Sequence, residues 1–338
     1  MDPPRATASL TNHLPSGSPQ PCASLRPRAA QAFSRLARPV LAFVLAFILV
    51  GPAPLSASPP ANDKIPVLII DGQNNHDWVR ATAILRDILA TSGLFTVDVS
   101  TTPDRAAPPE AWTAWRPDFA KYRVVISNYN SGHQPDAPRW PAEVETAFES
   151  YVRAGGGFVS YHAANNAFLQ WPAYNEMIGL GWREKTFGPS LIVSPDHSVI
   201  TLPAGQGRGP GHGPEHDFIV AVLNTEHPIT RGLPPTWFHP HEQLTHGQHG
   251  PAKNLTVLDY AYSKDTQENE PMDWTVSYGK GRVYTTMLGH LWKDGPDTAL
   301  RCAGFQTLFL RGTEWAATGR VTQPVPPDFP TPAAPSLR

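Results

Sequence analysis

The segment from Gly155 to Asn166 constrains the fold more than any other part of the chain. It reads GGGFVSYHAANN, a glycine turn followed by a short apolar strand that ends on polar side chains. Open α/β sheets bind their ligands at the carboxyl ends of the strands. A sharp strand-to-helix turn can present a nucleophile at that edge. Here the turn carries His162 where a serine or cysteine would be expected, which indicates proton transfer or metal ligation rather than acyl transfer.

Apolar patterning around this segment predicts an α/β fold with a parallel sheet. Strands are predicted where apolar residues run continuously or alternate, at 65–70, 95–99, 122–127 and 158–161. Helices are predicted where apolar residues recur at helical spacing or between stop signals, at 79–89, 140–153 and 298–317. Further strands are predicted at 218–222 and 254–262, with a hairpin formed by 274–278 and 282–288. The order of the first elements requires right-handed crossovers in a single domain over residues 64–320.

Residues 1–57 predict a signal peptide and leader. Five arginines face a single acidic residue before Pro39, an eleven-residue apolar stretch follows at 40–50, and small residues follow that. This order is typical of a secretory signal, so we expect a periplasmic or secreted protein. Eleven helical residues span about 16 Å, which is short for a hydrocarbon core of about 30 Å, and an interfacial or tail anchor is the alternative.

Charge and composition exclude some classes of partner. Without residues 1–57 the chain loses five positive charges and one negative, so the formal net charge of −2 becomes −6. No basic surface remains that could follow a phosphate backbone, and we expect no nucleic-acid partner. Cys302 is then the single cysteine, so no intramolecular disulfide is expected. The proline-rich residues 321–338 predict a disordered tail.

Polar turns follow four of the predicted strands. They lie at 74–77, 128–130, 162–166 and 289–290. Because the carboxyl ends of parallel strands share one edge, the first three are expected to open on one cleft. The fourth ends the second arm of the hairpin and can point the same way.

Histidines in these turns are the candidate catalytic residues. His162 is the first choice as general base or metal ligand, because an imidazole titrates near neutral pH. His76 or His290 would act as a second acid or base. Glu242 could orient a histidine or serve as an acid. Each has a plainer alternative: a buried histidine paired with backbone groups, a helix cap, or a solvated loop carboxylate.

Amides and aromatic rings are the candidate binding groups for a sugar. Asparagine side chains would hydrogen-bond hydroxyls or a developing oxyanion, and tryptophan faces would pack against a sugar ring, although most large aromatics belong to the core. The predicted substrate-binding residues are Asn75, Trp78, Asn130, Asn165, Asn166 and Trp274.

The cofactor stays open, with a divalent metal as one candidate. His212 and His216 lie four residues apart beside carboxylates, and both residue types are zinc ligands. Gly213 and Pro214 between them rule out a helical ligand pair. Solvated loop histidines are the alternative.

These segments resemble the ThuA-like family, named for trehalose utilisation. The likeness is carried by GQNNHDW at 72–78 and HAANNAF at 162–168, and it continues through 128–130, 171–179, 226–233, 270–282, 304–307 and 311–317. It implies a flavodoxin-like, class I glutamine amidotransferase-like three-layer sandwich with a mainly parallel sheet. Amidotransferase chemistry is not expected, because the turn carries His162 and Cys302 lies in the closing helix. The chain departs from the family where Gln243 and Thr245 replace an acid and a tyrosine, which puts the role of that acid in doubt.

The resemblance implies sugar catabolism, with keto-disaccharides supplied by a partner sugar 3-dehydrogenase. We therefore expect an exported enzyme that acts on keto-sugars or keto-glycosides by proton abstraction next to the carbonyl, leading to isomerisation or eliminative cleavage. The alternatives are a non-catalytic carbohydrate-binding or partner protein and a metal-dependent hydrolase, in which Glu242 would be a ligand or base. The sequence leaves the substrate and any homo-oligomer open.

Overall fold

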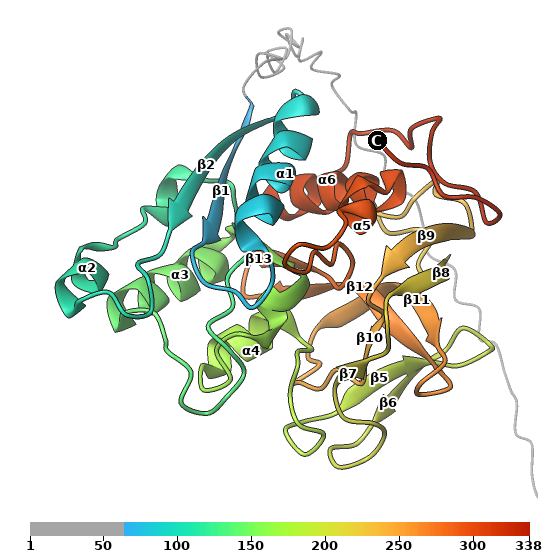
Figure 1. The fold of residues 1–338 in the computed structure, drawn as a ribbon, viewed down its shortest axis with the longest axis horizontal. Helices are drawn as coiled ribbons and strands as arrows, with labels where there is room; N and C mark the ends of the chain where they lie inside the picture. The colour runs from blue at the N-terminus through green and yellow to red at the C-terminus, as the bar shows by residue number, and fades with distance from the viewer. Residues whose placement is uncertain (1–63) are drawn as a thin grey trace, which may run out of the picture. The chain divides into compact units, whose positions relative to one another are not determined.

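A computed structural model describes residues 64–338 of the chain (Figure 1). The predicted signal peptide and leader lie outside the described residues. Among the helices that are described, none combines the length and apolar character needed to cross a membrane.

The centre of the fold is an eleven-stranded sheet whose first half is parallel. In spatial order this half consists of β2 (Phe95–Thr101), β1 (Ile65–Asp71), β3 (Val124–Ser127), β4 (Gly157–Tyr161) and β13 (Gly281–Thr286). Strands β3 and β4 are buried at every residue, as expected for parallel strands that are covered on both faces. Since the five strands run the same way, the turns that follow them open at one edge.

The second half of the sheet is antiparallel. It consists of β12 (Glu268–Tyr278), β11 (Leu255–Ser263), β8 (His216–Val222) and β9 (Thr236–Glu242). Strand β5 (Ser190–Val193) pairs with β12, and β6 (Val199–Leu202) pairs with β5. A separate two-stranded ladder pairs β7 (Gly211–His212) with β10 (Thr245–His246). The predicted hairpin is β12 and β13. Because β13 is antiparallel to β12 but parallel to β4, it joins the two halves and delivers the following turn to the shared edge.

Helices cover both faces of the parallel half and complete three layers (Figure 1). The helices are α1 (Trp78–Thr91), α2 (Pro109–Ala114), α3 (Ala142–Ala154), α4 (Pro172–Ile178), α5 (Thr298–Arg301) and α6 (Ala303–Thr318), with a 3-10 turn, η1 (Phe119–Lys121). Alternate residues of β1 divide between two cores. Val67 and Ile69 pack in the core with α1 and α6, whereas Leu68 and Ile70 pack in the core with α3 and α4. The predicted α/β sandwich is thus confirmed, and the antiparallel strands extend it.

Residues 321–338 are not the disordered tail that their proline content predicts. The side chain of Phe329 is buried against Trp237, with ring centroids 5.6 Å apart. The amide of Phe238 donates to the carbonyl of Thr331 at 3.0 Å. Prolines lose little backbone entropy when they are ordered, so one buried aromatic ring and a few hydrogen bonds hold this segment on the fold.

Candidate functional site

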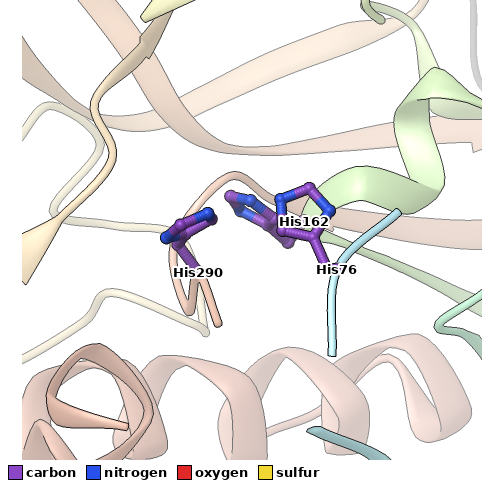
Figure 2. A group of neighbouring side chains, drawn as sticks. All are labelled: His76, His162 and His290. Atoms are coloured by element: carbon purple, nitrogen blue, oxygen red, sulfur yellow. The ribbon is translucent and has the colours of Figure 1, made fainter. Parts of the chain in front are cut away.

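Three histidines from distant parts of the chain meet at the carboxyl edge of the parallel strands. His76 follows β1, His162 follows β4 and His290 follows β13. Their ring centroids lie 5.0 Å (His76 and His162), 4.9 Å (His76 and His290) and 5.2 Å (His162 and His290) apart. Figure 2 shows the three rings turned toward one another. The remaining predicted turn, at 128–130 after β3, contributes Asn130 to the same edge.

The backbone of these turns adopts conformations that ordinary residues rarely take. His162 has a φ of 44°, in the left-handed region, and opens the 3-10 turn η2 (His162–Asn166). Such strain is concentrated at functional sites. Gly289, just before His290, has a φ of 91°, and a Cβ at that position would lie 2.7 Å from Phe305 and 2.8 Å from Tyr161. A glycine is therefore required for the turn that presents His290.

The Nδ1 atoms of His162 and His76 are held by oxygen atoms. Nδ1 of His162 donates to the carbonyl of Met287 at 2.6 Å. Nδ1 of His76 lies 3.2 Å from Oδ1 of Asn74 and 3.1 Å from Oδ1 of Asn75. Because these oxygens can only accept, the proton of each neutral ring is on Nδ1. The Nε2 lone pairs are therefore free.

Glu215 holds the third ring in the same way. Its Oε1 lies 2.8 Å from Nδ1 of His290, and its Oε2 lies 2.8 Å from Nε2 of His241. Nε2 of His290 and Nε2 of His76 are both buried, and neither has a hydrogen-bond partner. All three rings thus share one arrangement, with Nδ1 anchored and Nε2 available.

The cluster is electrically neutral at physiological pH. Burial lowers the pKa of His76 to about 2 and that of His162 to about 4, and the neighbouring imidazoles add to both shifts. Burial also lowers the pKa of His290. Such rings are unprotonated at neutral pH, which is the state that a metal ligand needs. One potential ligand nitrogen from each ring lies within 4.8 Å of the others, and this is the one group of that kind among the residues the structure describes.

A cleft of about 630 Å³ opens beside the cluster. His76 and His162 line it, together with the predicted residues Asn75, Trp78, Asn130, Asn166 and His212. It also contains Trp182 and residues that were not predicted to line it, among them Asp104, Arg105, Gln243 and Trp292. Trp292 is 47% exposed, and its ring stacks at 17° on that of His290. The cleft thus combines amides, indole faces and an imidazole centre, which suits a polar molecule with flat apolar faces.

A family model named ThuA and described as trehalose utilisation matches residues 66–316. The chain belongs to the ThuA family. That family places it in carbohydrate metabolism. A solved ThuA-like protein from Parabacteroides merdae is 38% identical, covers 82% of this chain and 98% of its own length, and superposes with a TM-score of 0.75.

Two more distant solved structures complete the comparison. A ThuA-like protein from Bacteroides uniformis is 20% identical over 79% of this chain and 96% of its own, with a TM-score of 0.49. The glutaminase domain of Trypanosoma brucei CTPS is 8% identical over 79% and 98%, with a TM-score of 0.38. The search of curated proteins found no match.

Glu242 of this ThuA-family chain is fully buried and does not line the cleft. Its carboxylate accepts from the amides of Gly289 at 2.6 Å and His290 at 3.2 Å, and from Nε2 of His239 at 3.0 Å. Burial alone would raise the pKa of Glu242, but His239 lowers it overall. Burial alone would lower the pKa of His239, but Cys302 and Glu242 raise it to about 10. The two therefore form a buried ion pair that supports the turn carrying His290.

Three other predicted site residues lie elsewhere. Trp274 belongs to the core, fully buried, and its Nε1 donates to the carbonyl of Ile178 at 2.7 Å. Asn165 is also fully buried, donates to Gln248 at 2.8 Å and does not line the cleft, since η2 turns it inward and its neighbour outward. His216 starts β8 and lies outside the cluster, because the β7–β10 ladder brings only His212 to the cleft. The predicted metal pair is therefore not assembled.

Two residues in contact with His290, Glu215 and Trp292, were missed by the sequence analysis. Glu215 stands between the two histidines that were considered as metal ligands, but its contact with His290 depends on how distant loops meet. Trp292 follows His290 by two residues, and this closeness was the one available signal.

Proposed function

We propose that this ThuA-family chain is an enzyme that acts on a keto-sugar or keto-glycoside in the cleft, by removal of a proton next to the carbonyl. The observation that supports the proposal is the convergence of three neutral imidazoles beside a cleft lined with amides and indole rings. A cleft that only bound sugar would need the amides and indoles but not this cluster.

The chemistry follows from the acidity of a carbon next to a carbonyl. A base takes the proton, and the electron pair moves onto the carbonyl oxygen to give an enediolate. Return of the proton to a neighbouring carbon isomerises the sugar, whereas expulsion of a leaving group in the β position cleaves a glycoside. The imidazole cluster would stand at the carbonyl, where charge develops, and preorganised groups at such a position contribute the largest share of catalysis.

The wall of the cleft would bind the rest of the sugar. The described residues show no hydrogen bond to the side-chain amide of Asn166, which is thus available to hydroxyl groups, whereas Asn75 and Asn130 bond to each other at 2.9 Å. Trp78, Trp182 and Trp292 would pack on ring faces.

The ketone must come from an oxidoreductase that oxidises a ring hydroxyl, so a sugar dehydrogenase is the proposed partner activity. Export of the chain to the periplasm or medium is part of the same proposal.

Solvent exchange tests the proposal directly. The full chain would be incubated with a 3-keto-glucoside in D2O and followed by NMR. Exchange of the hydrogen next to the carbonyl, together with a new isomer or released aglycone, is expected. Binding of the sugar without exchange or product would contradict the proposal and favour a carbohydrate-binding protein.

Removal of one imidazole is the matched experiment. His162→Ala is expected to lower turnover by about 10²- to 10⁴-fold with the fold intact. His197→Ala, an exposed histidine that does not line the cleft, is the control and should leave turnover unchanged.

A further inference from the structure

We infer that His76, His162 and His290 form a binding site for a divalent transition-metal ion, with zinc as the first candidate. The inference goes beyond the proposed function, because metal binding can be measured with no sugar present. Only the catalytic use of the metal rests on that function.

The first argument is the direction of the lone pairs. Each Nδ1 is occupied by an oxygen acceptor, so Nε2 is the nitrogen left to bind an ion in every ring. One ring nitrogen of each histidine lies within 4.8 Å of a ring nitrogen of the other two. A tetrahedral zinc ion with bonds of about 2.1 Å holds its ligands about 3.4 Å apart. Small rotations of the rings about their side-chain bonds would close this difference.

The second argument is that two of these nitrogens are buried without a partner. His76 and His290 are 8% and 5% exposed, and Nε2 of each makes no hydrogen bond. An unpaired buried acceptor destabilises a fold. Two such acceptors in one cluster with a third imidazole are explained when a cation binds to them.

The third argument is the second layer of contacts. Histidines that bind metals almost always donate their other ring N–H to a carbonyl or carboxylate, which fixes the tautomer and the ring orientation. Here the acceptors are the carbonyl of Met287, the side-chain oxygens of Asn74 and Asn75, and the carboxylate of Glu215. Each ligand thus has the support that a metal site requires.

The donor set selects the type of ion. Three neutral imidazoles suit zinc, iron, nickel or copper, whereas magnesium and calcium prefer oxygen ligands. Three protein ligands leave a fourth position for water or substrate, as in catalytic zinc sites. Because His76 and His162 line the cleft, that position faces the proposed sugar, and a carbonyl oxygen bound there would be polarised.

Zinc titration of the chelator-treated full chain tests the site. We expect one zinc ion per chain, and visible absorption bands of low-coordinate cobalt with nitrogen ligands when cobalt replaces zinc.

His76→Asn and His290→Asn should each weaken zinc binding at least 100-fold. His197→Asn is the matched control for an exposed histidine, and His212→Asn with His216→Asn tests the competing pair. Thermal melting with and without zinc checks the fold, and zinc should raise the Tm of the wild type but not of the cluster variants.

The outcomes separate this inference from the proposed function. Failure of the wild type to bind zinc or cobalt would overturn the inference, as would binding that survives loss of His76 and His290 or disappears in the His212 and His216 variant. Turnover of the keto-glycoside by protein that binds no metal would support the proposed function and contradict the metal site. Stoichiometric zinc binding without exchange or turnover would contradict the proposed function and leave the metal site in place.

Discussion

The carboxylate of Glu215 lies 2.8 Å from Nδ1 of His290, and the same carboxylate contacts the half-exposed ring of His241. One acid thus connects a buried ring of the cluster to a ring at the surface. Its negative charge strengthens the hydrogen bond from Nδ1 and raises the electron-donating capacity of the opposite nitrogen. Glu215 is therefore a positioning residue for the cluster rather than a member of it.

Substitution of Glu215 by Gln should lower the affinity of the cluster for zinc by roughly 10- to 100-fold, the usual effect of losing a second-layer partner. Competition against a chromophoric chelator measures this change. Glu215→Asp should recover part of the loss, and Glu110→Gln, at an exposed position on α2, should cause none. Equal zinc affinities for Glu215→Gln and wild type would show that the 2.8 Å contact does not tune the ring.

The members of the cluster could be predicted from the sequence, but its supporting contacts could not. His76, His162 and His290 each follow a strand, and parallel strands share an edge, so local pattern was enough to bring them together. The partner of His290 is set by the path of the chain between β7 and β8, which no local pattern encodes. His212 and His216 were misjudged for the same reason, because the β7–β10 ladder separates residues that are close in sequence.

Trp292 should contribute binding free energy to a sugar ring. Its 47% exposed ring lines the cleft and is held by stacking on His290. Trp292→Ala should weaken binding of a keto-glycoside by about 1 kcal/mol, or roughly fivefold, whereas Trp292→Phe keeps an aromatic face and should lose less. Calorimetric titration measures both, with zinc stoichiometry as the check that the cluster is intact. An unchanged Kd for Trp292→Ala would place the sugar elsewhere in the cleft.

A buried acid pair should make the fold less stable at high pH. Asp259 and Asp273 are fully buried and linked, with the amide of Asp273 donating to Asp259 at 2.9 Å. Burial and then the Asp273 charge raise the pKa of Asp259 well above 3.8, and burial raises that of Asp273 to about 6. Because the folded pKa values exceed the unfolded ones, their stabilisation is complete below pH 3.8. That of Asp273 is lost as the pH rises through about 6, and that of Asp259 is lost as the pH rises through its own raised pKa.

Asp259→Asn removes one of these charges and keeps an acceptor for the amide. We expect the variant to be more stable than the wild type by about 2 kcal/mol at pH 8, and to gain little at pH 4. Urea unfolding at the two pH values measures the difference, with the exposed Asp136→Asn as the control. A gain of the same size at both pH values would mean that ionisation is not the cause.

The ion pair of Glu242 with His239 should stabilise the fold and the His290 turn together. The pKa of Glu242 is lowered from 4.5 and that of His239 is raised from 6.5 to about 10. The contribution of Glu242 is lost as the pH falls through its folded pKa, and that of His239 is lost as the pH rises from 6.5 toward 10, so both are present at pH 5.5. Glu242→Gln removes the carboxylate charge that pairs with the buried His239, and should cost about 3–5 kcal/mol.

Urea unfolding at pH 5.5 measures this loss, and zinc titration of the folded variant reports whether the turn still presents His290. Glu268→Gln, on an exposed residue of β12, is the control. A variant with wild-type stability would show that a neutral acceptor at position 242 is enough to hold the turn, and that the charge of the carboxylate is not required.

Apolar patterning of the sequence predicts the parallel half of the fold, because strands such as β1 and β3 are continuous runs of apolar residues. It fails for β9, whose sequence TWFHPHE mixes histidine and proline with apolar residues, although the strand is hydrogen-bonded along β8. It fails again at residues 321–338, where composition indicates disorder but one buried aromatic ring and a few hydrogen bonds hold the segment on the fold.

That docking gives the last prediction. Phe329 is 9% exposed and packs edge-on against Trp237, at an interplanar angle of 68°. Phe329→Ala should destabilise the fold by about 2–4 kcal/mol, because it leaves a cavity beside Trp237. Leu337→Ala, at a 45% exposed position in the same segment, should change the free energy of unfolding by less than about 0.5 kcal/mol. Urea unfolding compares the two variants. If both behave alike, the segment does not contribute to the fold, and disorder, as the proline content predicted, is the correct description.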